Sequence, residues 1–182
     1  MDRLELKRAQ VAKTLGEMNY LDNSCLGNGD ELLVGQLMTT LPSCIPPETT
    51  AWDLIGLIHA KRFRHVLVTA GQNRLVGVIS DRDVIRCLGP EKHPSRDSLT
   101  RITAADIMST DLVTVWPNTP LRRAAVLMID EGISCLPVLA DSTLVGIITN
   151  TDLHVVLQIL LETAGRSSSE ESIVAAASSP QN

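Results

Sequence analysis

The 182-residue sequence predicts a mixed α/β fold in which two pseudo-symmetric βαββα units pack sheet to sheet as one module. Three observations lead to this prediction. Strings of residues recur at a nearly constant spacing, one amphipathic helix pattern recurs with them, and a unit of about 50 residues is too small to bury its own apolar faces. The two units are therefore expected to share a core.

The repeat is visible at both ends of each unit. MTT at 38–40 recurs 70 positions later as MST at 108–110, and LVGVIS at 75–80 recurs 69 positions later as LVGIIT at 144–149. The loss of one position falls in the turn before the second string. Two strings in the same order at one offset indicate an internal duplication.

An apolar stripe predicts one helix between these strings in each unit. Its members lie at i, i+3, i+4 and i+7: Ala51, Leu54, Ile55 and Ile58 in the first copy, and Leu121, Ala124, Ala125 and Met128 in the second. Thr119 is expected as the N-cap and Pro120 as the first helical residue of the second copy. Gly132 is typical of a helix end, and because the first copy has Arg62 there, we expect its helix to end differently.

Two strands and a second helix follow in each unit. The strands are predicted at 66–68 and 75–79, and again at 136–138 and 144–148. Pro137 has no N–H to donate, which predicts an edge or terminal place for its strand. The second helices are expected at 81–88, where Gly89 and Pro90 end the helix, and at 151–164.

These elements define five segments. Residues 1–32 form an N-terminal helical extension, with Leu4, Val11, Leu15 and Met18 on the apolar side of a helix. The first unit spans 33–90, a polar linker 91–103, and the second unit 104–164. The Ser/Ala-rich tail at 165–182 is expected to be disordered.

Composition restricts the classes of partner. The formal net charge of −5 and the aromatic content of 2% argue against a nucleic-acid surface, which needs a basic face or stacking platforms. The four cysteines are far apart, so we expect structural thiols in a reducing compartment and no metal site. A charged N-terminus and the absence of a membrane-length apolar run predict a cytoplasmic protein without a membrane partner.

With the repeat established, the sequence resembles a tandem pair of CBS motifs, the regulatory module named after cystathionine β-synthase. The resemblance covers about residues 33–162 and is carried by QLMT at 36–39, DIMS at 106–109, LVGVISDRD at 75–83 and LVGIITNTD at 144–152. It implies two clefts between the units, an adenosine ligand such as AMP, ADP, ATP or S-adenosylmethionine, and a disc-like homodimer. It also implies a stand-alone regulatory or energy-sensing protein that acts on an unknown partner, with no catalytic cofactor.

Both units end with a Ser/Thr-x-x-Asp motif where a strand turns into a helix: Ser80 with Asp83, and Thr149 with Asp152. One interpretation is a capping box, which satisfies free backbone N–H groups. The other is a ligand site, because a helix N-terminus suits a phosphate and a carboxylate accepts hydrogen bonds from ribose hydroxyls. In the family that the chain resembles, the corresponding Asp holds the ribose and the Ser or Thr lies by the phosphate.

Charge distinguishes the two copies. Arg82 adjoins Asp83, and Lys61, Arg62, Arg64 and His65 precede the first central strand, whereas Asn150, Thr151, Ser134 and Cys135 stand in the second copy. Guanidinium groups bind phosphate strongly, so the first cleft is predicted to take the more phosphorylated ligand. The resemblance also implies an adenine slot from Ile45, Val66, Val113, Val115 and Leu136. The full predicted ligand set is Thr40, Ile45, Arg64, His65, Val66, Ser80, Arg82, Asp83, Thr110, Val113, Val115, Leu136, Thr149, Thr151 and Asp152.

Two other functions stay open beside the adenosine-nucleotide regulator and its S-adenosylmethionine-sensing variant. In a ligand-free dimerisation scaffold, both acids would act only as caps. An enzyme would need a catalytic constellation, and no Ser/His/Asp, Cys/His or paired-carboxylate pattern recurs at a useful spacing. We therefore predict a binding module and not an enzyme.

Overall fold

A computed structural model describes residues 2–18, 31–71, 73–89 and 95–177, with side chains as far as Ala164. The chain divides into two compact units. The sheet unit contains residues 38–117 and 135–148, and the helical unit contains residues 1–37, 118–134 and 149–182. Each unit therefore combines parts of both sequence repeats.

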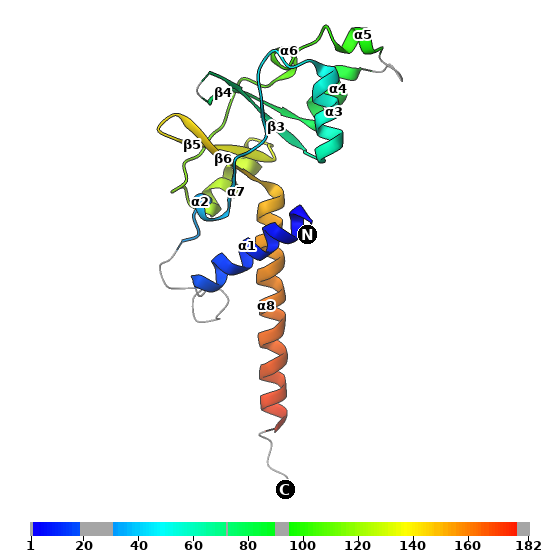
Figure 1. Cartoon of the computed structure of the whole chain (residues 1–182). Helices are drawn as coiled ribbons and strands as arrows, with labels where there is room; N and C mark the ends of the chain where they lie inside the picture. The colour runs from blue at the N-terminus through cyan, green and yellow to red at the C-terminus, as the bar shows by residue number, and fades with distance from the viewer. Residues whose placement is uncertain (1, 19–30, 72, 90–94, 178–182) are drawn as a thin grey trace. The chain divides into compact units, whose positions relative to one another are not determined.

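The sheet unit contains two three-stranded sheets (Figure 1). The order β2-β3-β4 joins Cys44–Ile45, His65–Ala70 and Arg74–Ser80. The order β1-β6-β5 joins Thr39–Thr40, Thr143–Thr149 and Cys135–Ala140. Pro137 thus lies in a terminal strand, as its missing N–H predicts.

The opening segment of each repeat pairs with the other repeat. β1 pairs antiparallel with β6, where Thr39 lies opposite Ile147, and Ser109 forms an antiparallel bridge to Val78 in β4. The next segment stays with its own repeat, because β2 pairs parallel with β3 and Val115 bridges Val138 in β5. The single opening strand predicted for each βαββα unit is therefore divided into two short pieces with different partners.

Apolar clusters of described residues stabilise the sheet unit. Leu67, Cys135, Leu144 and Ile147 come from both sheets and form one cluster, so the sheets pack face to face. Another cluster lies on β2, β3 and β4 under α3 (Ala51–Lys61), α4 (Asp81–Leu88) and α6 (Ala104–Ile107). Sheet-to-sheet packing and the bounds of α4 agree with the sequence predictions. The predicted linker contains the short helix α5 (Arg96–Leu99).

The two repeated helices end differently, as predicted, and the start of the second corrects one prediction. Arg62 is the left-handed C-cap of α3, with a φ of 52°. The C-cap of α7 (Leu121–Asp130) is the right-handed Glu131, and the left-handed Gly132, with a φ of 64°, comes one residue later. Pro120, with a ψ of 135°, is itself the N-cap of α7, one residue later than expected from the Thr-Pro pair.

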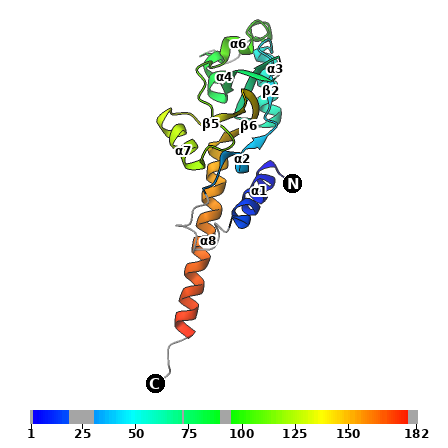
Figure 2. The ribbon, with the colours of Figure 1, turned by 90° about the vertical axis from the view of Figure 1, so that its left-hand side faces the viewer.

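The helical unit is built from α1 (Arg3–Glu17), α2 (Val34–Leu37), α7 and α8 (Asn150–Ala177). α1 lies against the first half of α8 (Figures 1 and 2). Val11 and Leu15 of α1 are fully buried as predicted, whereas Leu4 is 52% exposed.

α8 extends well beyond its predicted end. The helix continues to Ala177, so the tail predicted to be disordered from residue 165 is helical over most of its length. Alanine is the best helix former and serine is tolerated in helices, so this segment can continue the helix that precedes it. Within the described ranges, no helix has an apolar stretch that could cross a bilayer.

Candidate functional site

The first strand-to-helix corner is a capping box between β4 and α4. The backbone N–H and the hydroxyl of Ser80 donate to Asp83 Oδ2 at 2.8 and 2.6 Å, and Asp83 N–H donates back to Ser80 Oγ at 3.3 Å. The cap uses one carboxylate oxygen. Asp83 Oδ1 faces Arg86 Nη1 at 3.1 Å, and that arginine side chain is 80% exposed.

The start of β3 and the residue before it bring two predicted residues to this corner. His65 lies opposite Ser80 in the β3–β4 ladder, and Asp81 N–H donates to the Arg64 carbonyl at 3.0 Å. Burial, followed by the charge of Arg64, lowers the pKa of His65 below its ordinary value, and nearby carboxylates including Asp83 oppose this shift. His65 is therefore held close to the capped acid with a preference for its neutral form.

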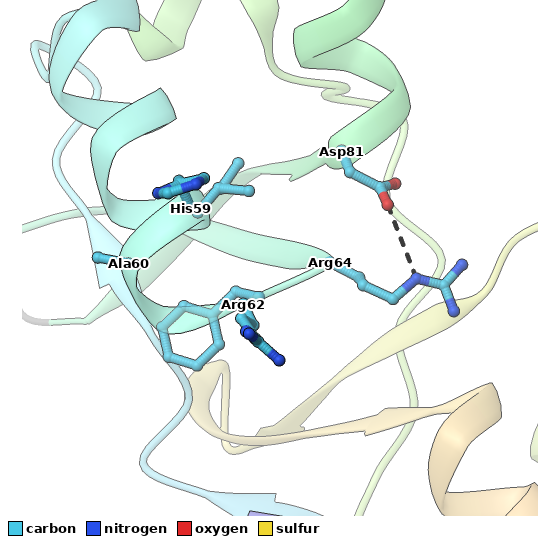
Figure 3. A pocket seen from close by; sticks show the side chains of 7 residues that line it. His59, Ala60, Arg62, Arg64 and Asp81 are labelled. Carbon is cyan, nitrogen blue, oxygen red and sulfur yellow. Dashed lines mark ion pairs between the residues drawn. The ribbon is translucent and has the colours of Figure 1, made fainter.

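A basic pocket of about 600 Å³ adjoins the corner at the end of α3 (Figure 3). Its lining includes His59, Arg62, Arg64 and Asp81. Arg64 Nε lies 3.7 Å from Asp81 Oδ2, and both side chains are well exposed. Because this ion pair is exposed, its guanidinium can exchange partners at little cost. Arg82 is also exposed, so this corner combines a capped acid with several solvent-facing cations.

Cys135, which the sequence analysis expected to be a structural thiol, is a neighbour of this corner. It lies on β5 of the second repeat, and its pKa is raised to about 12 by burial and then by the charge of Asp83. Asp83 is thus near residues of both repeats. Cys135 stands 70 positions after His65, so the repeat offset was the signal that could have identified it.

The other thiols give no sign of a metal centre. Cys44 and Cys87 are free, and burial raises the pKa of each. Cys25 lies outside the described residues. Over the part of the chain that the structure describes, no group of His, Cys, Asp and Glu side chains could hold a metal ion.

The second corner has the same cap in different surroundings. The backbone N–H and the hydroxyl of Thr149 donate to Asp152 Oδ2 at 2.7 and 2.8 Å. Asp152 is only 4% exposed, and its Oδ1 lies 2.9 Å from Lys7 Nζ on α1. Thr151 is exposed beside it. The sequence did not identify Lys7 as a candidate, because Lys7 lies outside both repeats and outside every recognised motif.

A capping box at Thr103 and Asp106 shows that the same hydrogen bonds form at the start of another helix. Thr103 donates from its N–H and its hydroxyl to Asp106 Oδ2, both at 2.8 Å, and these bonds lower the pKa of the fully exposed Asp106. Neither Thr103 nor Asp106 belongs to the predicted ligand set. The hydrogen bonds at Ser80 and Thr149 are therefore those of helix caps, and only their surroundings distinguish these two corners.

The residues of the predicted adenine slot are largely buried. Ile45 and Val66 belong to the apolar cluster covered by α3 and α4. Val115 and Leu136 are buried and Val113 is half-buried. The remaining two predicted residues, Thr40 and Thr110, are exposed on the short opening segments.

Comparison with known proteins gives relatives of the same fold. The AcuB protein of Vibrio cholerae is 30% identical in a solved structure, with a TM-score of 0.65, and the match covers 75% of this chain and 98% of that one. A crystal structure of CBSX2 in complex with AMP is 27% identical, with a TM-score of 0.58 and coverages of 70% and 97%. The homoserine O-acetyltransferase of Methanohalophilus mahii is 30% identical over 74% of this chain.

That acetyltransferase is much longer, and the matched region spans only 26% of its length. The model of the CBS domain family matches this chain twice, at residues 34–89 and 104–158. These two segments contain both repeats and both Ser/Thr-x-x-Asp corners. The chain belongs to the CBS domain family and carries a tandem pair of CBS domains.

Proposed function

We propose that this CBS-pair regulatory module binds an adenine nucleotide, AMP, ADP or ATP, at the corner formed by Ser80, Asp83, Arg64 and His65. The observation that carries the proposal is the combination of a partly buried carboxylate with exposed cations at one helix N-terminus. Ligand binding would change the conformation of the module or its homodimer, and so act on a regulated partner.

The groups at the corner suit the parts of a nucleotide. Asp83 Oδ1 is paired with the exposed Arg86, so a ribose hydroxyl could replace that arginine as the donor. The Ser80 hydroxyl donates to Asp83 Oδ2, and it could turn this donor toward a phosphate held at the N-terminus of α4. Arg64 and Arg82 could turn toward the same phosphate as charge-assisted donors. The AMP complex of the related CBSX2 supports the choice of ligand class.

A thermal-shift panel of AMP, ADP, ATP, S-adenosylmethionine and NADH tests the proposal. A ligand at 100 times its Kd stabilises a fold by about 2.7 kcal/mol. For a chain of this size, the expected rise in Tm is about 5–10 °C. Asp83→Asn should remove most of the shift given by an adenine nucleotide, and Asp152→Asn should remove less.

Asp106→Asn is the matched control, because it weakens an equivalent capping box away from the corner. The ligand should raise the Tm of Asp106→Asn by as much as it raises the Tm of the unaltered protein, even if the Tm of the ligand-free variant is lower. Equal losses in Asp83→Asn and Asp152→Asn would contradict the assignment to the first corner. A shift with S-adenosylmethionine alone would change the ligand class.

A ligand-free dimerisation scaffold is the second candidate. It is favoured by the capping box at Thr103 and Asp106, which shows that this hydrogen-bond pattern forms where no ligand is expected. A panel in which no compound changes Tm would support the scaffold. Turnover of ATP or AMP by the pure protein would instead indicate an enzyme.

A further inference from the structure

The second corner differs from the first in what its acid contacts. Lys7 Nζ lies 2.9 Å from Asp152 Oδ1 and also donates to the carbonyl of Leu37. The two charged side chains are 11% and 6% exposed. With Oδ2 engaged by Thr149, both oxygens of Asp152 have partners inside the helical unit.

The corresponding contact at the first corner is much weaker. Arg86 belongs to the same helix as Asp83, and its side chain is 80% exposed. An exposed ion pair of this kind contributes little to the free energy of folding, and another donor can easily replace the arginine. Breaking a buried pair leaves an uncompensated charge, which is strongly unfavourable. A ligand hydroxyl can therefore displace Arg86 far more easily than Lys7.

α1 holds Lys7 at this place through contacts made by the residues that follow it. Arg8 Nη2 donates to both carboxylate oxygens of Glu162 in α8, at 2.9 and 2.7 Å. Val11 and Leu15 follow on the same helix and are fully buried. The ammonium group is thus positioned by a docked helix and not by a flexible surface chain.

We propose that Lys7 is the specificity-determining residue that closes the second corner to adenosine ligands. Its ammonium takes the place of ligand hydroxyls on Asp152 while α1 is docked, so the ligand binds only at the first corner. This inference rests on the proposed function. It assigns a role to the N-terminal helix that neither the repeat nor the cap geometry requires.

Isothermal titration calorimetry with AMP on the full chain tests the inference. The unaltered protein should bind one AMP per chain, with no loss of affinity in Asp152→Asn. Lys7→Ala should bind a second AMP, and the double variant Lys7→Ala/Asp152→Asn should lose that second site. Lys13→Ala is the control, because Lys13 lies on the same helix with a 77% exposed side chain that pairs with Glu17.

A Lys7→Ala variant that gains no AMP site would overturn the inference, as would weaker AMP binding to Asp152→Asn. Lack of AMP binding to the unaltered protein would overturn the proposed function instead, and a site gained in Lys7→Ala would still support the role of Lys7.

Acetylation of lysines followed by peptide mass spectrometry provides a ligand-free measurement, which does not depend on how Lys7→Ala folds. Lys7 should react more slowly than Lys13, and Asp152→Asn should remove its protection. Equal reaction rates at the two lysines in the unaltered protein would contradict the docked position of Lys7.

Discussion

Asp83 and Asp152 accept the same cap hydrogen bonds on Oδ2 and face different cations on Oδ1. The sequence predicts both acids, because each lies in a repeated Ser/Thr-x-x-Asp motif. It does not predict Lys7, since that contact depends on how α1 docks in three dimensions. A repeat can thus identify equivalent positions without showing that their surroundings have diverged.

His65 gives a prediction on pH at the same scale. Burial and Arg64 lower its pKa in the folded state, so below about pH 6.5 the unfolded chain binds a proton that the folded chain resists. The free energy of unfolding should therefore fall as the pH decreases from about 7 toward about 5. His65→Gln should flatten this fall in urea titrations at several pH values.

His154→Gln, which alters an exposed histidine of α8, is the matched control for this measurement. A fall with the same slope in His65→Gln and in the unaltered protein would show that His65 is not the group responsible.

At the scale of elements, the segment that opens each repeat pairs with a strand of the other repeat. This pairing places a methionine against a glycine in each sheet. A Cβ on Gly146 would lie 2.6 Å from Met38 Sδ and 3.0 Å from the Thr39 carbonyl oxygen. A Cβ on Gly77 would lie 2.8 Å from Met108 Cβ. The repeated glycines are therefore required by the close approach of β1 to β6 and of Ser109 to β4.

Gly146→Ala should destabilise the protein by about 1–3 kcal/mol, because the backbone of Thr39 cannot move as freely as a side chain. Gly56→Ala is its control. Gly56 lies inside α3 with open space where a methyl group would stand, so alanine there should stabilise by up to about 1 kcal/mol. Urea unfolding measures both, and equal effects of the two variants would contradict the proposed strand contact.

Elements whose bounds depend on nearby residues could be predicted from the sequence, whereas contacts between distant segments could not. α4 begins and ends where the sequence predicts, because its capping box and Gly89 are local signals. The pairing of β1 with β6 was not predicted, since a periodic pattern does not specify which strand a segment joins. The N-cap of α7 was predicted one residue too early, at Thr119, because Pro120 keeps an extended ψ of 135° and is itself the N-cap.

At the scale of the whole molecule, duplication supplies two similar corners and divergence separates their roles. The first has exposed cations, a basic pocket and a neighbour, Cys135, from the other repeat. The second has a buried ion pair to α1. A ligand at the first corner would contact a sheet unit in which both repeats exchange strands, so its binding energy could bias their packing.

The central claim is that Asp83 binds the ribose of an adenine nucleotide, and a binding cycle with a modified ligand tests it most directly. The Kd values of AMP and of 2′,3′-dideoxyadenosine 5′-monophosphate would be measured for the unaltered protein and for Asp83→Asn. The unaltered protein should bind the dideoxy ligand about 10- to 100-fold more weakly than AMP, because that ligand lacks the hydroxyls that donate hydrogen bonds to the charged Asp83. Asp83→Asn should bind the two ligands with nearly equal affinity. Equal affinities in the unaltered protein, or the same loss in both proteins, would contradict the claim.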